Sequence, residues 1–438
     1  MIKKKTEDIM SRTPWFTESR YGLFIHFGLY SIASRHEWVQ TLEEMDTDSY
    51  KKYFEQFNPD LLDARTWAKK AKADGFKYVI ITAKHHEGFC LWDTKTTSYN
   101  VTNTPYQKDL LKELIEAFRE EGLKIGIYYS LLDWYHKDFL VDGYHPMRNN
   151  VSYIEENKKG DMENYRQYMR NHITELLSNY GEISYLWFDF SYQERSWKNF
   201  NGKGAKDWGS EELERLIYSI QPNILLNDRL DLNRGVTTPE QFARSTGMDK
   251  DWETVQTLNN SWGYDRDNLD FKSSEMVAKQ LVDTVSKGGN FTMNIGPNPR
   301  GEWDNRSDEI LSNVGEWLRK HGESIYGASE SEFPPPVDCR YTKKGDKLYL
   351  HLFSYPYRSL LLSDLGGKVK FARFLHDGSE IRFANTKDLD PVRKTEENLY
   401  HEVTVLHIGE ALDPTMLLLH LPIQMPDELI PVIELTLK

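Results

Sequence analysis

Residues 185–190 read Tyr-Leu-Trp-Phe-Asp-Phe, an aromatic, apolar run with a single acid, Asp189, near its end. Short apolar runs rich in aromatic residues are typical of buried strands. A carboxylate at the carboxyl end of a buried strand lies where barrel enzymes hold their catalytic groups. An Asp in this position also commonly caps the turn that follows. The run alone therefore leaves both interpretations of Asp189 open.

Working outward from this run, strands of the same kind alternate with amphipathic helices between about residues 20 and 325. The predicted strands are Gly22–Phe27, Lys77–Thr82, Lys124–Tyr129, Tyr185–Asp189, Asn223–Asn227, Trp252–Gln256 and Asn290–Ile295. The predicted helices are Leu61–Asp74, Asp109–Glu121, Met162–Asn179, Ser210–Ile220, Ser273–Lys287 and Ser307–Lys320. Repeated strand–helix units require a parallel sheet with right-handed crossovers. With seven readable strands, room for an eighth, and no Gly-x-Gly-x-x-Gly after any strand, we expect a (β/α)8-like barrel.

Three consecutive prolines, Pro334 to Pro336, end this pattern. Beyond them the helical periodicity is lost, and short alternating strands are predicted at Lys347–Phe353, Lys368–Leu375, Glu380–Ala384, His401–Ile408 and Met416–His420. This spacing is typical of an antiparallel β-sandwich. We therefore predict two domains, a catalytic barrel over residues 1–330 and a small antiparallel β-sandwich over residues 337–438.

The charge and composition of the chain exclude several classes of partner and site. The net charge of −13 argues against nucleic acid or an anionic membrane as partner, and no apolar segment approaches the length of a membrane span. Two cysteines, Cys90 and Cys339, predict neither a disulfide framework nor a cysteine-based zinc site. We expect a cytoplasmic protein that needs no cofactor and no metal. The oligomeric state cannot be predicted from the sequence.

Polar side chains lie at or just beyond the carboxyl ends of five consecutive predicted strands. They are His26, the pair His85-His86, Tyr129 with Ser130, Asp189, and the triplet Asn227-Asp228-Arg229. In a barrel, the carboxyl ends of all strands meet at one mouth. A metal-dependent hydrolase is one interpretation of the histidines and acids, but the chain has no HxH, HExxH or CxxC spacing. Histidines also bind sugar hydroxyls without a metal.

Hydrolysis of a glycoside needs two carboxyl groups, one as nucleophile or base and one as proton donor. Asp189 is the first candidate. Glu240, Glu253 and Glu37 are candidates for the second. Glu240 falls in a predicted loop, whereas Glu253 falls inside a predicted strand and fits a structural role better. Local pattern does not decide among the three.

Taken together, several ordered motifs resemble those of glycoside hydrolase family 29, the retaining α-L-fucosidases. The resemblance covers roughly residues 14–325. It rests on the segments at 21–28, 36–38, 84–89, 128–130, 187–189, 227–229, 252–254, 261–264, 287–290 and 294–297, which read YGLFIHFG, HEW, KHHEGF, YYS, WFD, NDR, WET, SWGY, KGGN and NIGP. Each motif is weak alone, but their shared order is specific.

The resemblance implies an exo-acting α-L-fucosidase that works by double displacement, with fucosylated oligosaccharides or glycoconjugates as substrates. It makes Asp189 the nucleophile and Glu240 the general acid/base. It assigns substrate binding to His26, Glu37, Trp38, His85, His86, Tyr129, Trp187, Arg229 and Trp262. Phe190 departs from the family, where a small residue is common after the nucleophile. The family often carries an export signal, and none is seen here, which suggests action on small imported oligosaccharides. The alternatives are a catalytically silent sugar-binding protein and a metal-dependent barrel hydrolase.

Overall fold

The computed structural model describes residues 14–198, 200–242, 247, 251–388 and 413–438. The chain divides into two compact units. The first comprises residues 1–243, 249–272 and 290–312, and the second comprises residues 244–248, 273–289 and 313–438. The predicted domain boundary between residues 330 and 337 remains a prediction.

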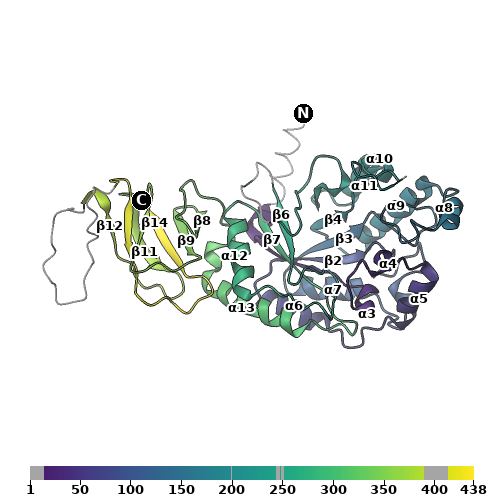
Figure 1. The fold of residues 1–438 in the computed structure, drawn as a ribbon, viewed down its shortest axis with the longest axis horizontal. Coiled ribbons are helices and arrows are strands. Elements are labelled where there is room, and N and C mark those ends of the chain that lie inside the picture. The colour runs from purple at the N-terminus through teal and green to yellow at the C-terminus, as the bar shows by residue number, and fades with distance from the viewer. Residues whose placement is uncertain (1–13, 199, 243–246, 248–250, 389–412) are drawn as a thin grey trace. The chain divides into compact units, whose positions relative to one another are not determined.

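The first unit is built on a seven-stranded parallel sheet, as the sequence predicts (Figure 1). Its strands, in sheet order, are β5 (Leu225–Leu226), β4 (Tyr185–Asp189), β3 (Lys124–Ser130), β2 (Tyr78–Lys84), β1 (Tyr21–Ile25), β7 (Asn290–Ile295) and β6 (Glu253–Thr257). Six of the seven are buried along their whole length, and β3 has a single exposed residue, its first, as is typical of strands covered on both faces. The predicted TIM-like architecture is confirmed.

The segment 236–241 links the two edge strands of this sheet. Val236 forms a parallel bridge with Asn227 just after β5, and Thr237 forms one with Trp252 just before β6. Glu240 then bridges Val255 of β6. The segment thus occupies the place of an eighth strand, but Pro239 has no N–H to donate and interrupts the ladder. Because the bridges are parallel, Glu240 lies toward the same end of the sheet as Asp189.

Helices follow most strands in sequence. Those in the first unit are α2 (Pro14–Ser19), α3 (Tyr30–Ala33), α4 (Val39–Leu42), α5 (Thr47–Gln56), α6 (Ala64–Ala73), α7 (Leu110–Glu120), α8 (Val151–Asn157), α9 (Met162–Asn179), α10 (Ala205–Trp208) and α11 (Ser210–Ile220). Aspartates cap the longer ones: Asp63, Asp109 and Asp161 accept hydrogen bonds from the first-turn N–H groups of α6, α7 and α9. Helix α12 (Ser274–Val285) belongs to the second unit, and α13 (Asn305–His321) begins in the first unit and ends in the second.

Side chains alternate along the strands, so each strand sends every second residue into the barrel. Phe24, Ile80, Tyr128, Trp187 and Val255 meet there in one buried cluster. These aromatic and aliphatic side chains fill the barrel interior and support the groups at its mouth.

The second unit contains two antiparallel sheets. One has the order β10 (Ser359–Leu362), β13 (Leu417–His420), β12 (Phe383–Asn385), and the other β11 (Val369–Phe374), β14 (Val432–Leu437), β9 (Lys347–Leu352), β8 (Cys339–Lys344). Leucines of both sheets share one buried core. The predicted antiparallel unit is confirmed, although the predicted strand at 401–408 lies outside the described residues. In the part of the chain that the structure describes, no helix has the length and apolar character needed to span a bilayer.

Candidate active site

Asp189 is the last residue of β4, and its carboxylate is held by two donors. The hydroxyl of Tyr128 donates to Oδ2 at 2.8 Å, and the guanidinium of Arg229 donates to Oδ1 at 3.2 Å. The side chain is 12% exposed. A turn-capping role would rest on backbone N–H groups alone, whereas here the N–H of Phe190 is joined by two side chains at the barrel mouth, those of Tyr128 and Arg229. The structure therefore favours the functional interpretation of Asp189.

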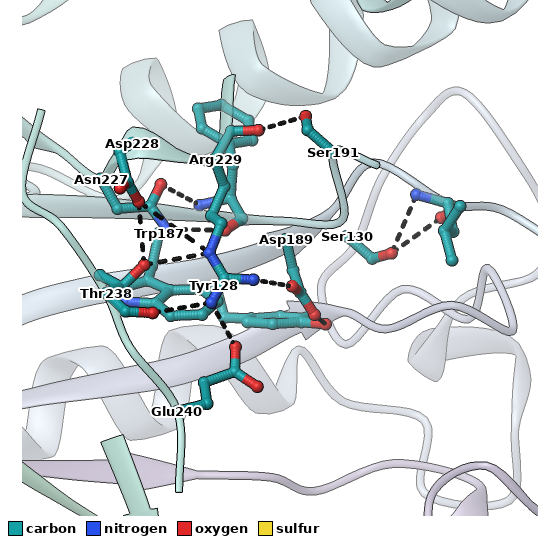
Figure 2. Close-up of polar contacts among 12 residues, drawn as sticks. Tyr128, Ser130, Trp187, Asp189, Ser191, Asn227, Asp228, Arg229, Thr238 and Glu240 are labelled. Carbon is teal, nitrogen blue, oxygen red and sulfur yellow. Dashed lines mark hydrogen bonds and ion pairs between the residues drawn. The ribbon is translucent and has the colours of Figure 1, made fainter. Parts of the chain in front are cut away.

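Arg229 connects Asp189 to a second carboxylate. Its other terminal nitrogen donates to Glu240 Oε1 at 2.6 Å, and Figure 2 shows the guanidinium between the two acids. Thr238 fixes the arginine by accepting from Nε and from the terminal nitrogen that contacts Glu240. The guanidinium carbon lies 5.2 Å from the ring centroid of Trp187. Asp189 and Glu240 are thus brought together around one cation.

Burial and the charge of Glu240 raise the pKa of Asp189 to about 7, while Arg229 and Tyr128 oppose this rise. The ionisation of Asp189 is therefore linked to the charge of its neighbour Glu240. A pKa of about 7 places this ionisation close to neutral pH.

The three predicted histidines line the same region. His86 Nε2 lies 3.9 Å from Asp189 Oδ2, and its Nδ1 lies 2.7 Å from the hydroxyl of Ser130. His85 packs on His86 with ring centroids 3.9 Å apart, and His26 packs edge-on against His85. Burial lowers the pKa of all three rings. Near neutral pH the cluster is uncharged, as suits rings that bind hydroxyl groups.

The carboxylate of Glu37 accepts hydrogen bonds from backbone N–H groups. Its Oε2 accepts from the N–H groups of Trp262 and Gly263 at 3.1 and 2.9 Å, and its side chain is fully buried. The structure therefore places Glu37 as a support for the Trp262 loop and gives it no contact with Arg229. A Cβ at Gly296 would lie 2.5 Å from this loop's backbone, so glycine permits the close approach.

Two of the predicted aromatic residues, Trp38 and Trp262, pack against the histidines at this mouth. Trp38 packs against His86 with centroids 4.8 Å apart and against Phe190 at 5.2 Å. Trp262 packs against His26 at 5.3 Å. Phe190 has a φ of 76°, in the left-handed region that favours glycine. The departure at this position is therefore a bulky residue in a conformation better suited to a small one.

The prediction for Tyr129 needs correction. Its hydroxyl bonds Nδ1 of His172 on α9 at 3.0 Å, and Nζ of Lys84 lies over its ring. Neighbouring residues of a strand point to opposite faces, so Tyr128, not Tyr129, points into the barrel and reaches Asp189. The alternation of side chains along β3 was the signal that sequence reasoning missed.

Glu253 lies inside the barrel away from Arg229. Its carboxylate accepts from the hydroxyls of Tyr78, Tyr185 and Thr292 and from the indole N–H of Trp187, at 2.7 to 3.0 Å. The residue is 0% exposed. Burial raises its pKa, and the four donors oppose the rise. With its hydrogen-bonding capacity filled by the protein, Glu253 has a structural role.

Comparisons with known proteins agree with this geometry. Residues 2–323 match the family described as α-L-fucosidase. Human plasma α-L-fucosidase is 32% identical over 379 residues, which cover 77% of this chain and 75% of the relative. The chain belongs to the α-L-fucosidase family.

Solved structures extend the likeness over nearly the whole chain. α-L-Fucosidase isoenzyme 1 from Paenibacillus thiaminolyticus is 39% identical with a TM-score of 0.88, covering 98% of this chain and 99% of its own. A Bacteroides thetaiotaomicron family 29 α-L-fucosidase, trapped as a covalent intermediate with 2-fluoro-fucosyl fluoride, is 26% identical with a TM-score of 0.79, covering 98% and 96%. The fold and activity of this fucosidase are those of a retaining glycoside hydrolase.

Metal-dependent hydrolysis requires a set of ligands. Among the described residues, no group of three or more His, Cys, Asp or Glu side chains is arranged to hold a metal ion. Arg229 is the cation that the structure places between the two acids.

Proposed function

We propose that Asp189 is the nucleophile and Glu240 the general acid/base of this α-L-fucosidase. The observation that carries the proposal is the shared guanidinium of Arg229, which bonds one carboxylate on each side at the barrel mouth. The alternatives Glu37 and Glu253 are engaged by backbone N–H groups and by core hydroxyls respectively. Glu240 is the most exposed of the three acids, with a side chain 32% exposed, so it has access to a leaving group and to water.

In the first step, Asp189 attacks the anomeric carbon of the fucosyl residue. The bond from this carbon to the glycosidic oxygen breaks, and Glu240 gives its proton to the departing oxygen. In the second step, Glu240 removes a proton from water, whose oxygen attacks the same carbon and displaces Asp189. Two inversions give net retention of configuration.

The surroundings suit a terminal deoxy sugar. His26, His85 and His86 supply polar ring nitrogens for the hydroxyl groups, and the edge of Trp262 supplies an apolar wall for the C5 methyl group. Trp187 supports the pocket from below, because its ring lies under Arg229 and stacks on Tyr128. We propose that the enzyme removes terminal α-L-fucosyl residues from oligosaccharides or glycoconjugates.

Azide rescue tests the two assignments separately. With an aryl α-L-fucoside, Asp189→Gly should be inactive, and azide should restore turnover to the fucosyl azide of inverted configuration. Glu240→Ala should instead give the azide of retained configuration, because the nucleophile is still present. No rescue of Glu240→Ala would return the acid/base role to Glu37 or Glu253.

We also propose that the enzyme acts in the cytoplasm on imported fucosylated oligosaccharides. Support comes from Cys90 and Cys339, which are both buried free thiols. Fractionation of the producing cells with an activity assay tests this location. Activity confined to an exported fraction would contradict it.

A further inference from the structure

Asn294, the fifth residue of β7, connects two groups of the pocket. Its Oδ1 lies 2.6 Å from Nδ1 of His26, and its Nδ2 donates to the backbone carbonyl of Trp262 at 2.7 Å. Asn294 is buried with 2% exposure. One amide therefore contacts both a histidine of the hydroxyl-binding cluster and the aromatic wall.

The carbonyl of Trp262 fixes which way this amide points. A backbone carbonyl only accepts hydrogen bonds, so the amide must present its NH₂ group there. The reverse orientation would place two carbonyl oxygens against each other. The loop itself cannot turn the carbonyl away easily, because Glu37 holds the N–H groups of Trp262 and Gly263. Oδ1 of Asn294 consequently faces His26.

An amide oxygen also only accepts, so the hydrogen bond at 2.6 Å requires a proton on Nδ1 of His26. Burial, together with the nearby His85, lowers the pKa of His26 well below its ordinary value. The ring is therefore neutral near neutral pH and carries a single proton. That proton is on Nδ1, which leaves Nε2 with a lone pair.

We infer that Asn294 is a positioning residue that makes His26 a hydrogen-bond acceptor, so that the pocket requires a donating hydroxyl group on the fucosyl ring where it meets His26. This inference rests on the proposed function for the occupant of the pocket. It adds a requirement for substrate binding: at that ring position, the sugar hydroxyl must donate its proton in a hydrogen bond to Nε2 of His26. Fluorine or an ether oxygen cannot replace it.

Fluorinated sugars distinguish the two possible roles of His26. L-Fucose and its monodeoxy and monofluoro analogues at C2, C3 and C4 are measured as competitive inhibitors of aryl fucoside hydrolysis. One of these ring positions is the one that contacts His26. It is identified as the position at which removal of the hydroxyl weakens inhibitor binding strongly in the wild-type enzyme but only slightly in His26→Phe. At that position we expect the fluoro and deoxy analogues to bind equally poorly, about tenfold or more weaker than L-fucose. A fluoro analogue that binds nearly as well as L-fucose would overturn the inference, because fluorine can accept but not donate.

Asn294→Leu tests the positioning role. We expect its discrimination between hydroxyl and fluorine at that position to fall several-fold toward unity, because the ring is no longer held in one tautomer. Asn290→Leu is the matched control: Asn290 is also buried on β7, but its amide donates to the carbonyl of Phe16 at the other end of the strand. The control should keep wild-type discrimination. Unchanged discrimination in a folded Asn294→Leu protein would contradict the inference.

Nitrogen NMR of histidine-labelled, substrate-free enzyme reads the tautomer without any variant or activity. A resonance pair assigned to His26 by its loss in His26→Phe should show a protonated Nδ1 and a bare Nε2. The opposite tautomer would overturn the inference while leaving the roles of Asp189 and Glu240 intact. Conversely, failure of the azide test would remove those roles without changing the tautomer.

Discussion

Asp189 and Glu253 lie inside the same barrel, and the difference between their surroundings separates chemistry from structure. Glu253 is bonded to Tyr185, the first residue of β4, and has four side-chain donors and no exposed surface. Asp189 ends the same strand, has two side-chain donors, and keeps some exposure. Burial raises the pKa of both carboxyls.

The comparison teaches that burial alone does not mark a catalytic acid. A carboxylate saturated by protein donors stabilises the fold, whereas one that shares a cation with a second acid at the mouth can exchange protons and bonds with a substrate. Variants at the two ends of the barrel should therefore have different effects.

The largest effect is expected from Asp189→Asn. The amide keeps the shape of the side chain but cannot form the covalent intermediate, so kcat/KM should fall by about 10⁴-fold or more. Steady-state hydrolysis of an aryl α-L-fucoside measures the loss, and circular dichroism checks the fold. A decrease of only a few-fold would remove Asp189 from the chemistry.

Glu240→Gln should have the next largest effect. Without a transferable proton, kcat/KM for a fucosylated disaccharide should fall by about 10²–10³-fold. A fucoside with an acidic phenol as leaving group needs less protonation and should lose much less in its first step. Equal losses on both substrates would argue that Glu240 only orients Arg229.

Glu253→Gln should act mainly on stability. Its new NH₂ group would face donors that need an acceptor, so the free energy of unfolding should decrease by about 1–3 kcal/mol. The kcat/KM of the folded protein should stay within a few-fold of wild type. Urea denaturation and the aryl fucoside assay measure both quantities. A normal unfolding midpoint with a large loss of activity would reverse the assigned roles of Glu253 and Glu240.

The dependence of kcat/KM on pH tests whether Asp189 and Glu240 are electrostatically coupled. Asp189 is active when ionised, so kcat/KM should rise with pH through its pKa of about 7. The charge of Glu240 raises that pKa, so Glu240→Gln should move the acidic limb to lower pH, by up to about one pH unit. The profile is recorded with an activated aryl fucoside. An acidic limb that stays in place or moves to higher pH would show that the two acids are not coupled.

The smallest expected effect separates two adjacent tyrosines. Tyr128→Phe removes a donor to Asp189 and should lower kcat/KM by about 5–10-fold. Tyr129→Phe removes only a bond to His172 and should leave kcat/KM near wild type. The same assay measures both. The reverse ranking would restore the original prediction for Tyr129.

Most strands and helices of the barrel could be predicted from the sequence, because buried strands and capped helices have strong local patterns. β4, β7, α9 and α11 have the predicted bounds. The bridging segment 236–241 was not read as a strand, because Pro239 and its polar neighbours lack a strand pattern. The antiparallel strands β8, β10 and β14 were also missed. β8 carries Arg340, Lys343 and Lys344, which mask its alternation.

The candidate site also has residues that could be predicted from the sequence and residues that could not. Asp189, Arg229 and the histidines follow strands and could be placed at the mouth from sequence alone. The direction of a single side chain cannot be predicted in this way, because Tyr128, not Tyr129, points inward. Local pattern also does not rank Glu240 above Glu37 and Glu253. The resemblance to the family ranks Glu240 first, and the hydrogen-bond partners of the three acids support that ranking. Such contacts join residues far apart in the chain and leave no local pattern.

Covalent trapping tests the central claim most directly. The enzyme is incubated with 2-fluoro-fucosyl fluoride, digested, and analysed by mass spectrometry of its peptides. The account predicts one added 2-fluoro-fucosyl group, located on Asp189, and none in Asp189→Asn. A label on Glu240 or Glu253, or rapid hydrolysis with no label at any time, would contradict it.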